Sequence, residues 1–363
     1  MDTMLTIGVA LGKTAFIILF VLSLAAVLTW VERKQSAVMQ DRIGANRASI
    51  FGLRLWGLFH IIADSVKMFT KEDFTPDTPH RFLHATAPVI AIFLALVAFA
   101  VIPFGNAITI AGHTISLQVV DLNVGLLYLF AMGSVAVYGV VLAGWSSNNN
   151  YALLGSVRAS AQMISYEITI GLTLVGLIMI YQTLSLVEIV QAQGGLLFGF
   201  LPAWGVFLQP VGCILFLVAG IAETKRIPFD IPEGESEIIG FFVEYSSMKF
   251  GMFMFADFIE VVLLSAMMTT FFFGGWQVPW MADTGFVFPW GGGWDLNVLV
   301  VEGLRIAAFI VKVAFFCWFL MLVRWTLPRF RFDQLMHLGW KILLPLSLVN
   351  TMVTALIVLW LGW

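Results

Sequence analysis

The feature that most constrains this chain is a series of apolar stretches, each long enough to cross a bilayer. A helix that spans the hydrocarbon core needs roughly 20 mainly apolar residues. The sequence therefore predicts an all-α integral membrane protein with about eight transmembrane helices, in a single membrane domain over residues 1–363. The predicted spans are residues 6–30, 82–104, 124–145, 157–181, 204–222, 238–273, 302–325 and 340–361.

Composition supports a bilayer environment. Of the 363 residues, 60% are hydrophobic and only 11% are charged, whereas soluble globular proteins carry about 25% charged residues. The sixth stretch is longer than a straight span needs, so we expect a tilted helix or one that overhangs the membrane. A net charge of −3 gives no indication of a nucleic-acid partner.

Lysine and arginine residues occur almost entirely in alternate loops. The connections 105–123, 182–203 and 274–301 contain neither residue type, and the N-terminal tail has only Lys13. Because loops rich in Lys and Arg stay in the cytoplasm, we expect the basic loops to be cytoplasmic. An even number of spans then places both termini on the outer, periplasmic side of a bacterial inner membrane.

A charged stretch between the first two spans has helical periodicity. His60, Asp64 and Lys67 recur every three or four residues, while apolar residues such as Phe59 and Ile62 fall largely on other sides. This pattern predicts an amphipathic helix over residues 51–69 that lies in the membrane interface. An ordinary surface helix packed on the protein would show the same pattern.

Several ionisable residues fall inside the predicted spans. Glu167 lies at mid-depth in the fourth span and has no basic residue nearby in that span, so it is a candidate proton carrier. A charge at the bilayer centre costs about 2.5–3.5 kcal/mol on insertion scales. The spacing places Lys249 and Glu260 on one helix face. Either neutralisation between helices or a place on a proton path would explain the remaining charges, which are Lys249, Asp257, Glu260, Arg305 and Lys312.

Acidic residues crowd the loop that follows the fifth span, and we expect residues 223–237 to form an acidic cytoplasmic loop. Pro228 and Pro232 prevent a continuous helix there. Like charges this close titrate as a coupled group, and with Glu167 and Glu244 they form a candidate proton-accessible cluster. A solvated acidic loop is the alternative. The acids of this loop are Glu223, Asp230, Glu233, Glu235 and Glu237.

The end of the first span is densely charged. Residues 30–44 mix acids and amides with Arg33, Lys34 and Arg42. A polar lip beside an amphipathic helix can admit a lipid-like substrate, because polar groups meet its head and apolar walls accept its tail. Alternatively, the basic residues only anchor the helix at the cytoplasmic face.

The chain carries no sequence signature of a cofactor of its own. Cys213 and Cys317 lie singly in apolar stretches, and no C-x-x-C pair is present to ligate an iron–sulfur cluster. The five histidines show no metal-ligand spacing. Phosphate-binding and dinucleotide-binding glycine motifs are also absent.

Three of these segments together carry a family resemblance. Residues 32–44, 155–167 and 223–244 resemble the H subunits of proton-pumping NADH:quinone oxidoreductase, respiratory complex I, and the resemblance covers essentially the whole chain. One departure is Ala45, where that family usually has proline. The resemblance implies a membrane protein of the complex that joins the peripheral and membrane arms, forms most of the quinone-binding chamber and couples quinone reduction to proton translocation.

The resemblance also implies the roles of individual residues and partners. Quinone is the substrate, while FMN and iron–sulfur clusters belong to partner subunits, and this chain has no catalytic residue in the strict sense. The expected partners are the peripheral-arm subunits of the quinone site, the small and antiporter-like membrane subunits, and phospholipid. The chamber would be bordered by Arg33, Lys34, Arg42, Asp64, Lys67 and Phe229. The proton path would contain Glu167, Glu223, Asp230, Glu233, Glu235, Glu237 and Glu244.

Two other functions fit parts of the pattern. The membrane subunit of a related membrane-bound hydrogenase shares the architecture and much of the acidic loop, but the complete first cytoplasmic segment favours the quinone enzyme. A stand-alone ion transporter would use the buried acids as an ion site. Such transporters often contain inverted repeats with broken helices at matching positions, and the sequence shows no such pairing.

Overall fold

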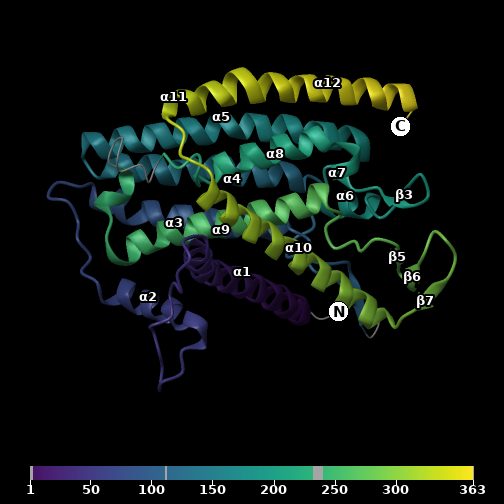
Figure 1. Ribbon diagram of the computed structural model, residues 1–363, viewed down its shortest axis with the longest axis horizontal. Coiled ribbons are helices and arrows are strands. Elements are labelled where there is room, and N and C mark those ends of the chain that lie inside the picture. Colours follow the sequence, from purple (N-terminus) through teal and green to yellow (C-terminus); the bar gives the residue numbers. More distant parts are fainter. Residues whose placement is uncertain (1–2, 111–112, 232–239, 363) are drawn as a thin grey trace.

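The computed structural model describes residues 3–110, 113–231 and 240–362, and this part of the chain folds into a bundle of helices lying side by side (Figure 1). The long helices are α1 (Thr3–Met39), α3 (Arg81–Val97), α4 (Gly125–Ser146), α5 (Asn150–Tyr181), α9 (Ser247–Phe272), α10 (Val298–Thr326) and α12 (Leu344–Leu361). Shorter helices are α2 (Phe59–Thr70), α6 (Leu186–Ala192), α7 (Gly205–Leu208), α8 (Pro210–Glu223) and α11 (Phe332–His337).

Seven helical segments in the described residues are long and apolar enough to cross a membrane. The fifth predicted span is the exception, because it divides into α7 and α8 at Gln209, where Pro210 begins α8. Proline lacks the amide hydrogen that would continue the α7 hydrogen-bond ladder. The 14 residues of α8 extend about 21 Å at 1.5 Å per residue, which is less than the hydrocarbon thickness of about 30 Å.

The sixth apolar stretch is not one long helix. A 3-10 turn, η3 (Phe241–Glu244), precedes α9, which begins only at Ser247. The turn folds its aromatic rings onto α9, with ring centroids 5.4 Å apart for Phe241 and Phe253. The excess length therefore forms a packed turn, and the expectation of a single overhanging helix over residues 238–273 is wrong for this part of the stretch.

The predicted amphipathic helix is shorter than residues 51–69. A 3-10 turn, η1 (Leu55–Gly57), is followed by α2, and none of the residues of α2 is buried. The early residues instead form a tight turn closed by a bridge between Ile50 and Leu53. Gly57 explains the break, because its φ is +92° and an added Cβ would lie 1.9 Å from the Ala45 carbonyl oxygen.

Short antiparallel strands occupy the connections that lack Lys and Arg. They form the pairs β1 (Ile108–Ile110) with β2 (His113–Ile115) and β3 (Leu196–Leu197) with β4 (Leu201–Pro202), and the three-stranded sheet of β5 (Met281–Ala282), β6 (Gly285–Val287) and β7 (Gly293–Asp295). The labelled strands and both chain ends lie toward the same end of the bundle (Figure 1). A π-helical segment, η4 (Leu338–Leu343), joins α11 to α12, and a 3-10 turn, η2 (Ala98–Val101), extends α3.

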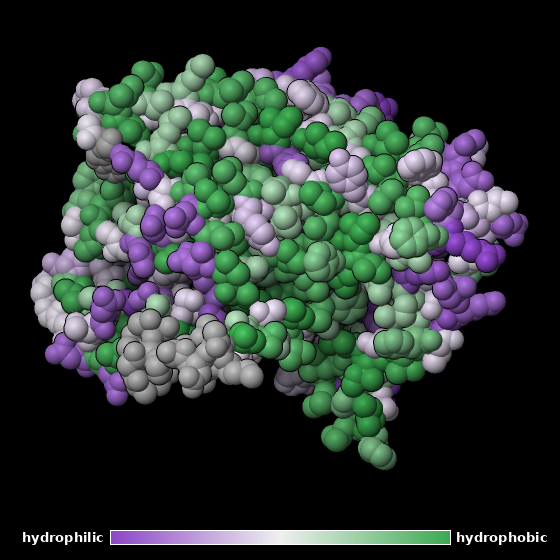
Figure 2. Space-filling view, turned by 180° about the vertical axis from the view of Figure 1, so that it is seen from behind, coloured by the Kyte–Doolittle hydropathy of each residue, from purple (hydrophilic) through white to green (hydrophobic). Residues whose placement is uncertain are grey.

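The bundle has an aromatic core and an apolar exterior. Tyr166, Phe216 and Phe271 are fully buried, and the Tyr166 hydroxyl donates to the Leu335 carbonyl oxygen over 2.9 Å, which links α5 to α11. Hydrophobic residues form a broad band across the face in Figure 2, while hydrophilic residues gather mostly toward its two ends. This distribution suits a bilayer, because the exposed middle of the bundle contacts lipid.

Candidate functional site

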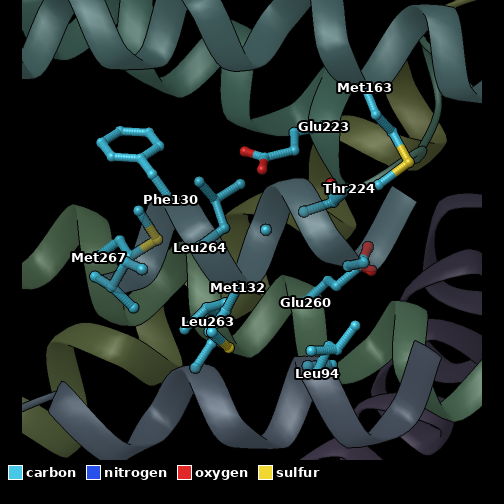
Figure 3. A pocket seen from close by; sticks show the side chains of 15 residues that line it. Leu94, Phe130, Met132, Met163, Glu223, Thr224, Glu260, Leu263, Leu264 and Met267 are labelled. Carbon is cyan, nitrogen blue, oxygen red and sulfur yellow. The ribbon is translucent and has the colours of Figure 1, made fainter. Parts of the chain in front are cut away.

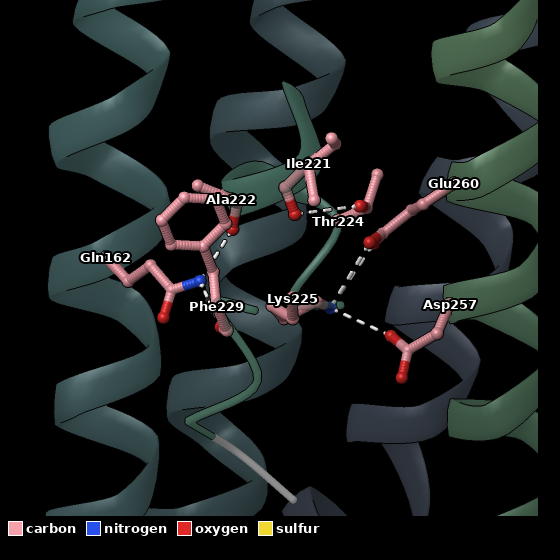
Figure 4. A network of polar contacts seen from close by, with 8 residues as sticks. All are labelled: Gln162, Ile221, Ala222, Thr224, Lys225, Phe229, Asp257 and Glu260. Atoms are coloured by element: carbon pink, nitrogen blue, oxygen red, sulfur yellow. Dashed lines mark hydrogen bonds and ion pairs between the residues drawn. The ribbon is translucent and has the colours of Figure 1, made fainter. Parts of the chain in front are cut away.

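A buried lysine joins the loop after α8 to α9 (Figure 4). The Lys225 Nζ atom lies 3.0 Å from Asp257 Oδ1 and 3.3 Å from Glu260 Oε2, and the lysine side chain is 5% exposed. Burial by itself lowers the pKa of Lys225, but the two carboxylates together outweigh it and hold that pKa above its usual value. Lys225 is therefore charged at neutral pH and shared between two acids.

A buried amide holds the backbone of the same loop. The Gln162 side chain of α5 is fully buried, and its Nε2 donates to the carbonyl oxygens of Ala222 at 2.6 Å and Phe229 at 2.8 Å. In the sequence, Ala222 and Phe229 stand on either side of the basic pair Lys225 and Arg226, and Figure 4 shows Gln162 reaching both carbonyls. This single side chain closes the loop at its base, which positions both basic residues.

A second group of charged residues connects α1, α10 and the loop after α8. Glu32 of α1 lies 3.6 Å from the Arg226 Nη1 atom and 3.1 Å from the Arg324 Nη1 atom of α10. The Arg226 guanidinium also sits over the Phe258 ring, 4.3 Å from its centroid, which adds a cation–π contact. Glu32 therefore lies between two arginines that are 7% and 11% exposed, and it ties α1 and α10 to the loop.

An apolar cavity of about 60 Å³ lies between α3, α4, α5, α8 and α9 (Figure 3). Its polar lining comes from Glu223, Thr224 and Glu260, whereas the other walls are mostly leucine, methionine and alanine. One water molecule occupies about 30 Å³ of liquid volume, so the cavity has room for about two waters. The two carboxylates share one small space inside the bundle.

The other predicted proton-path acids have separate partners. Glu167 accepts a short hydrogen bond from the Ser134 hydroxyl of α4. Asn149 donates its side-chain amide to Glu244 Oε1 over 2.6 Å. Asp230, which is 1% exposed, accepts from Arg329 Nη2 at 3.0 Å. Glu233, Glu235 and Glu237 lie outside the described residues.

Two of the described acids, Glu223 and Glu167, lie close enough for their charges to interact. The charge of Glu167 acts directly on Glu223, as does the charge of Glu260. Glu244 instead lies beside the Asn149 side chain, where α4 gives way to α5. The described acids therefore have different partners and do not gather in one pocket.

Most of the predicted chamber residues lie where α1 meets α2. Arg33 Nη1 forms an ion pair with Asp64 Oδ2 at 2.6 Å, which joins the two helices. Lys34 donates to the Ile43 carbonyl oxygen at 3.1 Å, and Arg42 donates to Gln40 Oε1 at 2.7 Å. Lys67 is exposed on α2.

Phe229 lies apart from these residues. It is 3% exposed and packs between Tyr166 and Phe330, at centroid distances of 5.6 and 5.5 Å. The structure therefore places Phe229 in the packed interior beside the charged loop, and the basic residues of the predicted chamber on the surface between α1 and α2.

The charges left open by the sequence have three kinds of partner. Lys249 pairs with Asp73 at 2.9 Å, although the periodicity placed it on the same face as Glu260. Arg305 binds Glu302 of its own helix and Asp283 of the preceding loop, both at 2.7 Å. Lys312 donates to three backbone carbonyls just after α9, those of Phe273, Gly275 and Gln277.

Sequence reasoning did not assign Glu32, Arg226, Arg324 or Gln162 to the site. The signal was present for Glu32, which stands in the charged end of the first span, and for Arg226, which lies in the acidic loop. No sequence pattern indicates that Lys225 pairs with Glu260, because the two residues are 35 positions apart. Gln162 stands within the segment 155–167 that carries part of the resemblance, but its side chain is uncharged, so only the fold reveals its role.

Helices long enough to cross a bilayer, packed around a buried network of acids and bases, define a multi-pass α-helical membrane protein with ionisable groups held in its interior. The chain belongs to the NADH dehydrogenase family, whose family model matches residues 12–355. The resemblance inferred from the sequence motifs is therefore confirmed.

Similar proteins are named as H subunits of NADH-quinone oxidoreductase. The one from Flavobacterium johnsoniae is 45% identical over 336 residues, which cover 91% of this chain and 89% of the relative. One from Geobacter metallireducens is 46% identical, with 98% of each chain covered. The protein from Bdellovibrio bacteriovorus is 40% identical, with 95% of each covered.

Proposed function

We propose that this chain is the membrane component of a bacterial proton-translocating NADH:quinone oxidoreductase that joins the two arms, forms most of the quinone chamber and couples quinone reduction to proton movement. The observation that carries the proposal is the buried network in which Lys225, Glu32 and their partners connect α1, α9 and α10 to the loop after α8. Buried charges in a bundle are expensive, so a network of this size favours a role in moving charge.

The proposed topology has eight spans in the inner membrane, with both termini on the periplasmic side. The fifth crossing would consist of α7 and α8 together, since α8 alone is short. Support comes from the two chain ends lying toward one end of the bundle (Figure 1). At that end, Lys13 donates to the Gln118 carbonyl oxygen over 3.1 Å, inside a connection that lacks Lys and Arg.

The proposed quinone chamber is entered between α1 and α2. Arg33, Lys34, Arg42, Asp64 and Lys67 would border its polar mouth, and Phe229 its apolar depth. The ion pair of Arg33 with Asp64 supports this assignment, because it places polar groups at the joint of a spanning helix and an exposed amphipathic helix. A quinone has a polar head and an apolar tail, which suits a lip of this composition.

The proposed proton path contains Glu167, Glu223, Asp230, Glu233, Glu235, Glu237 and Glu244. Quinone reduction consumes protons and changes the charge at the chamber. Coupled carboxylates respond to such a change by redistributing their protons. The new charge distribution then biases the conformations of neighbouring membrane subunits.

The proposed partners are the peripheral-arm subunits of the quinone site, the small and antiporter-like membrane subunits, and phospholipid. FMN and the iron–sulfur clusters would reside in those partners, and this chain would supply no redox centre. The names of the relatives favour the quinone enzyme over a membrane-bound hydrogenase or a stand-alone transporter. Purification of the chain with NADH-oxidising partners would support the proposal, and purification with hydrogenase proteins would contradict it.

A photoreactive quinone analogue tests the chamber directly. In membranes that contain the whole complex, we expect crosslinks on α1 and α2 near Arg33 and Asp64, and on the loop near Phe229. Excess unlabelled quinone should suppress them. Competable crosslinks confined to other subunits, or to the lipid-facing side of α12, would contradict the assignment.

A further inference from the structure

We propose that Lys225 is a gating residue for proton transfer between Glu223 and Glu260, an inference that rests on the proposed function. In this assignment the position of the Lys225 ammonium decides which carboxylate remains ionised and which holds a proton. Lys225 would be a positioning residue, since it acts through the two acids and touches no substrate.

The geometry places one cation among several acids. Lys225 contacts both Asp257 and Glu260, at 3.0 and 3.3 Å. Glu223 and Glu260 line the same cavity, with Thr224 between them (Figure 3). A lysine has a long flexible stem and three donors, so its ammonium can shift between carboxylates while the Gln162 clamp holds its backbone.

Other charged groups act on this cluster from the loop itself and from α5, and further ones follow on α1 and α10. Arg226 of the same loop acts on Glu260, and Glu167 of α5 acts on Glu223. Beyond Arg226, the chain of ion pairs continues through Glu32 of α1 to Arg324 of α10. Arg226 forms its ion pair with Glu32, whereas Lys225 forms ion pairs with two acids of α9, one of which, Glu260, also lines the cavity.

Charge balance explains why such a cation can gate a proton. One ammonium cannot stabilise three carboxylates in apolar surroundings, because repulsion between the acids and the loss of hydration favour a protonated form. With Lys225 on Asp257 and Glu260, the proton resides on Glu223. When Lys225 moves toward Glu223, the O–H bond of Glu223 breaks and an O–H bond forms on Glu260, while the lysine keeps its three protons.

The cavity supplies a route for this transfer. Its volume of about 60 Å³ admits about two waters at roughly 30 Å³ each, and polar groups at both ends can hold them. The remaining walls are apolar and offer no competing acceptor. Transfer is therefore directed between the two acids, under the control of the lysine.

The test uses inverted membrane vesicles that contain the whole complex. Quinone-dependent NADH oxidation and protons pumped per NADH are measured from pH 6 to pH 9 for Lys225→Met, which keeps the stem and removes the charge. Without the ammonium the carboxylates bind their protons more strongly. A deprotonated carboxylate that can accept a proton is therefore available only at a higher pH. We expect the acidic limb of the pH profile to move up by about one pH unit, the lower end of the effect of a neighbouring charge.

Three further variants separate gating from packing. Lys225→Arg should keep the wild-type profile, because it retains the charge. In the double variant Lys225→Met with Glu260→Gln, pumping per NADH should fall no further than in Glu260→Gln alone, because the lysine controls a transfer that needs this acid. Lys249→Met is the matched control, since Lys249 is a lysine on α9 bound to a single acid at the edge of the bundle, and we expect no shift.

Several results would overturn the proposal. One is an unshifted pH profile in Lys225→Met with only a smaller amount of complex, and another is a double variant that pumps fewer protons per NADH than Glu260→Gln alone. If Lys225→Met does not assemble, Glu260→Gln tests the proposal by itself. The proposal requires that Glu260→Gln pumps fewer protons per NADH while it retains electron transfer. Loss of the proposed function would be recognised separately, if deletion of the whole chain left quinone-dependent NADH oxidation intact.

Discussion

The two ends of the bundle hold buried charge in different ways. Toward the end with the β-strands, Lys13 and Lys312 bind backbone carbonyls, and Arg305 binds Glu302 of its own helix together with Asp283, whose side chain is 88% exposed. Around the loop after α8, acids and bases are shared, because Lys225 serves two carboxylates and Glu32 serves two arginines.

This difference separates charges that hold the structure from charges that can be redistributed. A lysine bound to backbone carbonyls has partners that cannot take up or release a proton. A lysine shared between carboxylates has partners whose protonation can change. Both arrangements offset the cost of burying charge, but only the second leaves alternative states of similar energy.

The largest effect on stability should come from Arg305→Met. This change leaves the Glu302 carboxylate, which is 7% exposed, without its buried partner, and breaking a buried pair costs about 3–5 kcal/mol. We expect less assembled complex and a lower Tm in detergent, with normal pumping per NADH in what assembles.

Arg305→Met combined with Glu302→Gln is the matched control. The double variant removes the orphaned charge and should recover much of the lost stability. A wild-type Tm for Arg305→Met, or a changed pumping ratio, would place this pair among the redistributable charges and contradict the comparison.

Lys312→Met should have the next largest effect. The ammonium donates to three carbonyls after α9 and lies 4.5 Å from the centroid of the Trp204 ring. Its loss leaves buried acceptors unsatisfied, which costs about 1–3 kcal/mol where one such group stays unpaired. The free energy of unfolding should fall while the pH profile of activity keeps its shape, and a shifted profile would show that Lys312 serves the proton path.

Glu167→Gln should change stability least and function most clearly. The amide oxygen can still accept from Ser134, so the free energy of unfolding should stay within about 1 kcal/mol of wild type, the worth of a neutral hydrogen bond, and the Tm should change little. An amide cannot carry a proton, so we expect fewer protons pumped per NADH. Unchanged pumping with an unchanged Tm would remove Glu167 from the path, and Ser134→Ala controls for the hydrogen bond alone.

The sequence predicts the spans well because membrane helices follow apolar length, which is local information. It fails where the backbone meets a local obstacle: Pro210 divides the fifth stretch, and Gly57 delays the start of α2 to Phe59. The phenylalanines of η3 are as apolar as those of a helix, so hydropathy cannot reveal that they belong to a turn.

The candidate site was predictable in part. Buried acids are visible in a sequence as charges within apolar stretches, which is how Asp257, Glu260 and Glu167 stand out. Their partners are decided by how distant helices pack. Lys249 accordingly binds Asp73 and not the acid on its own helix face, and the link from Glu32 to Arg324 joins the first helix to the tenth.

The clamp formed by Gln162 has a consequence for how a signal can cross this protein. Because one amide fastens the chain both before Lys225 and after Arg226, the main chain there cannot slide along α5 without breaking both hydrogen bonds. Protons and side-chain tips are the parts left free to travel. A signal would then cross this region by proton transfer and side-chain movement, while the main chain of the loop stays in place.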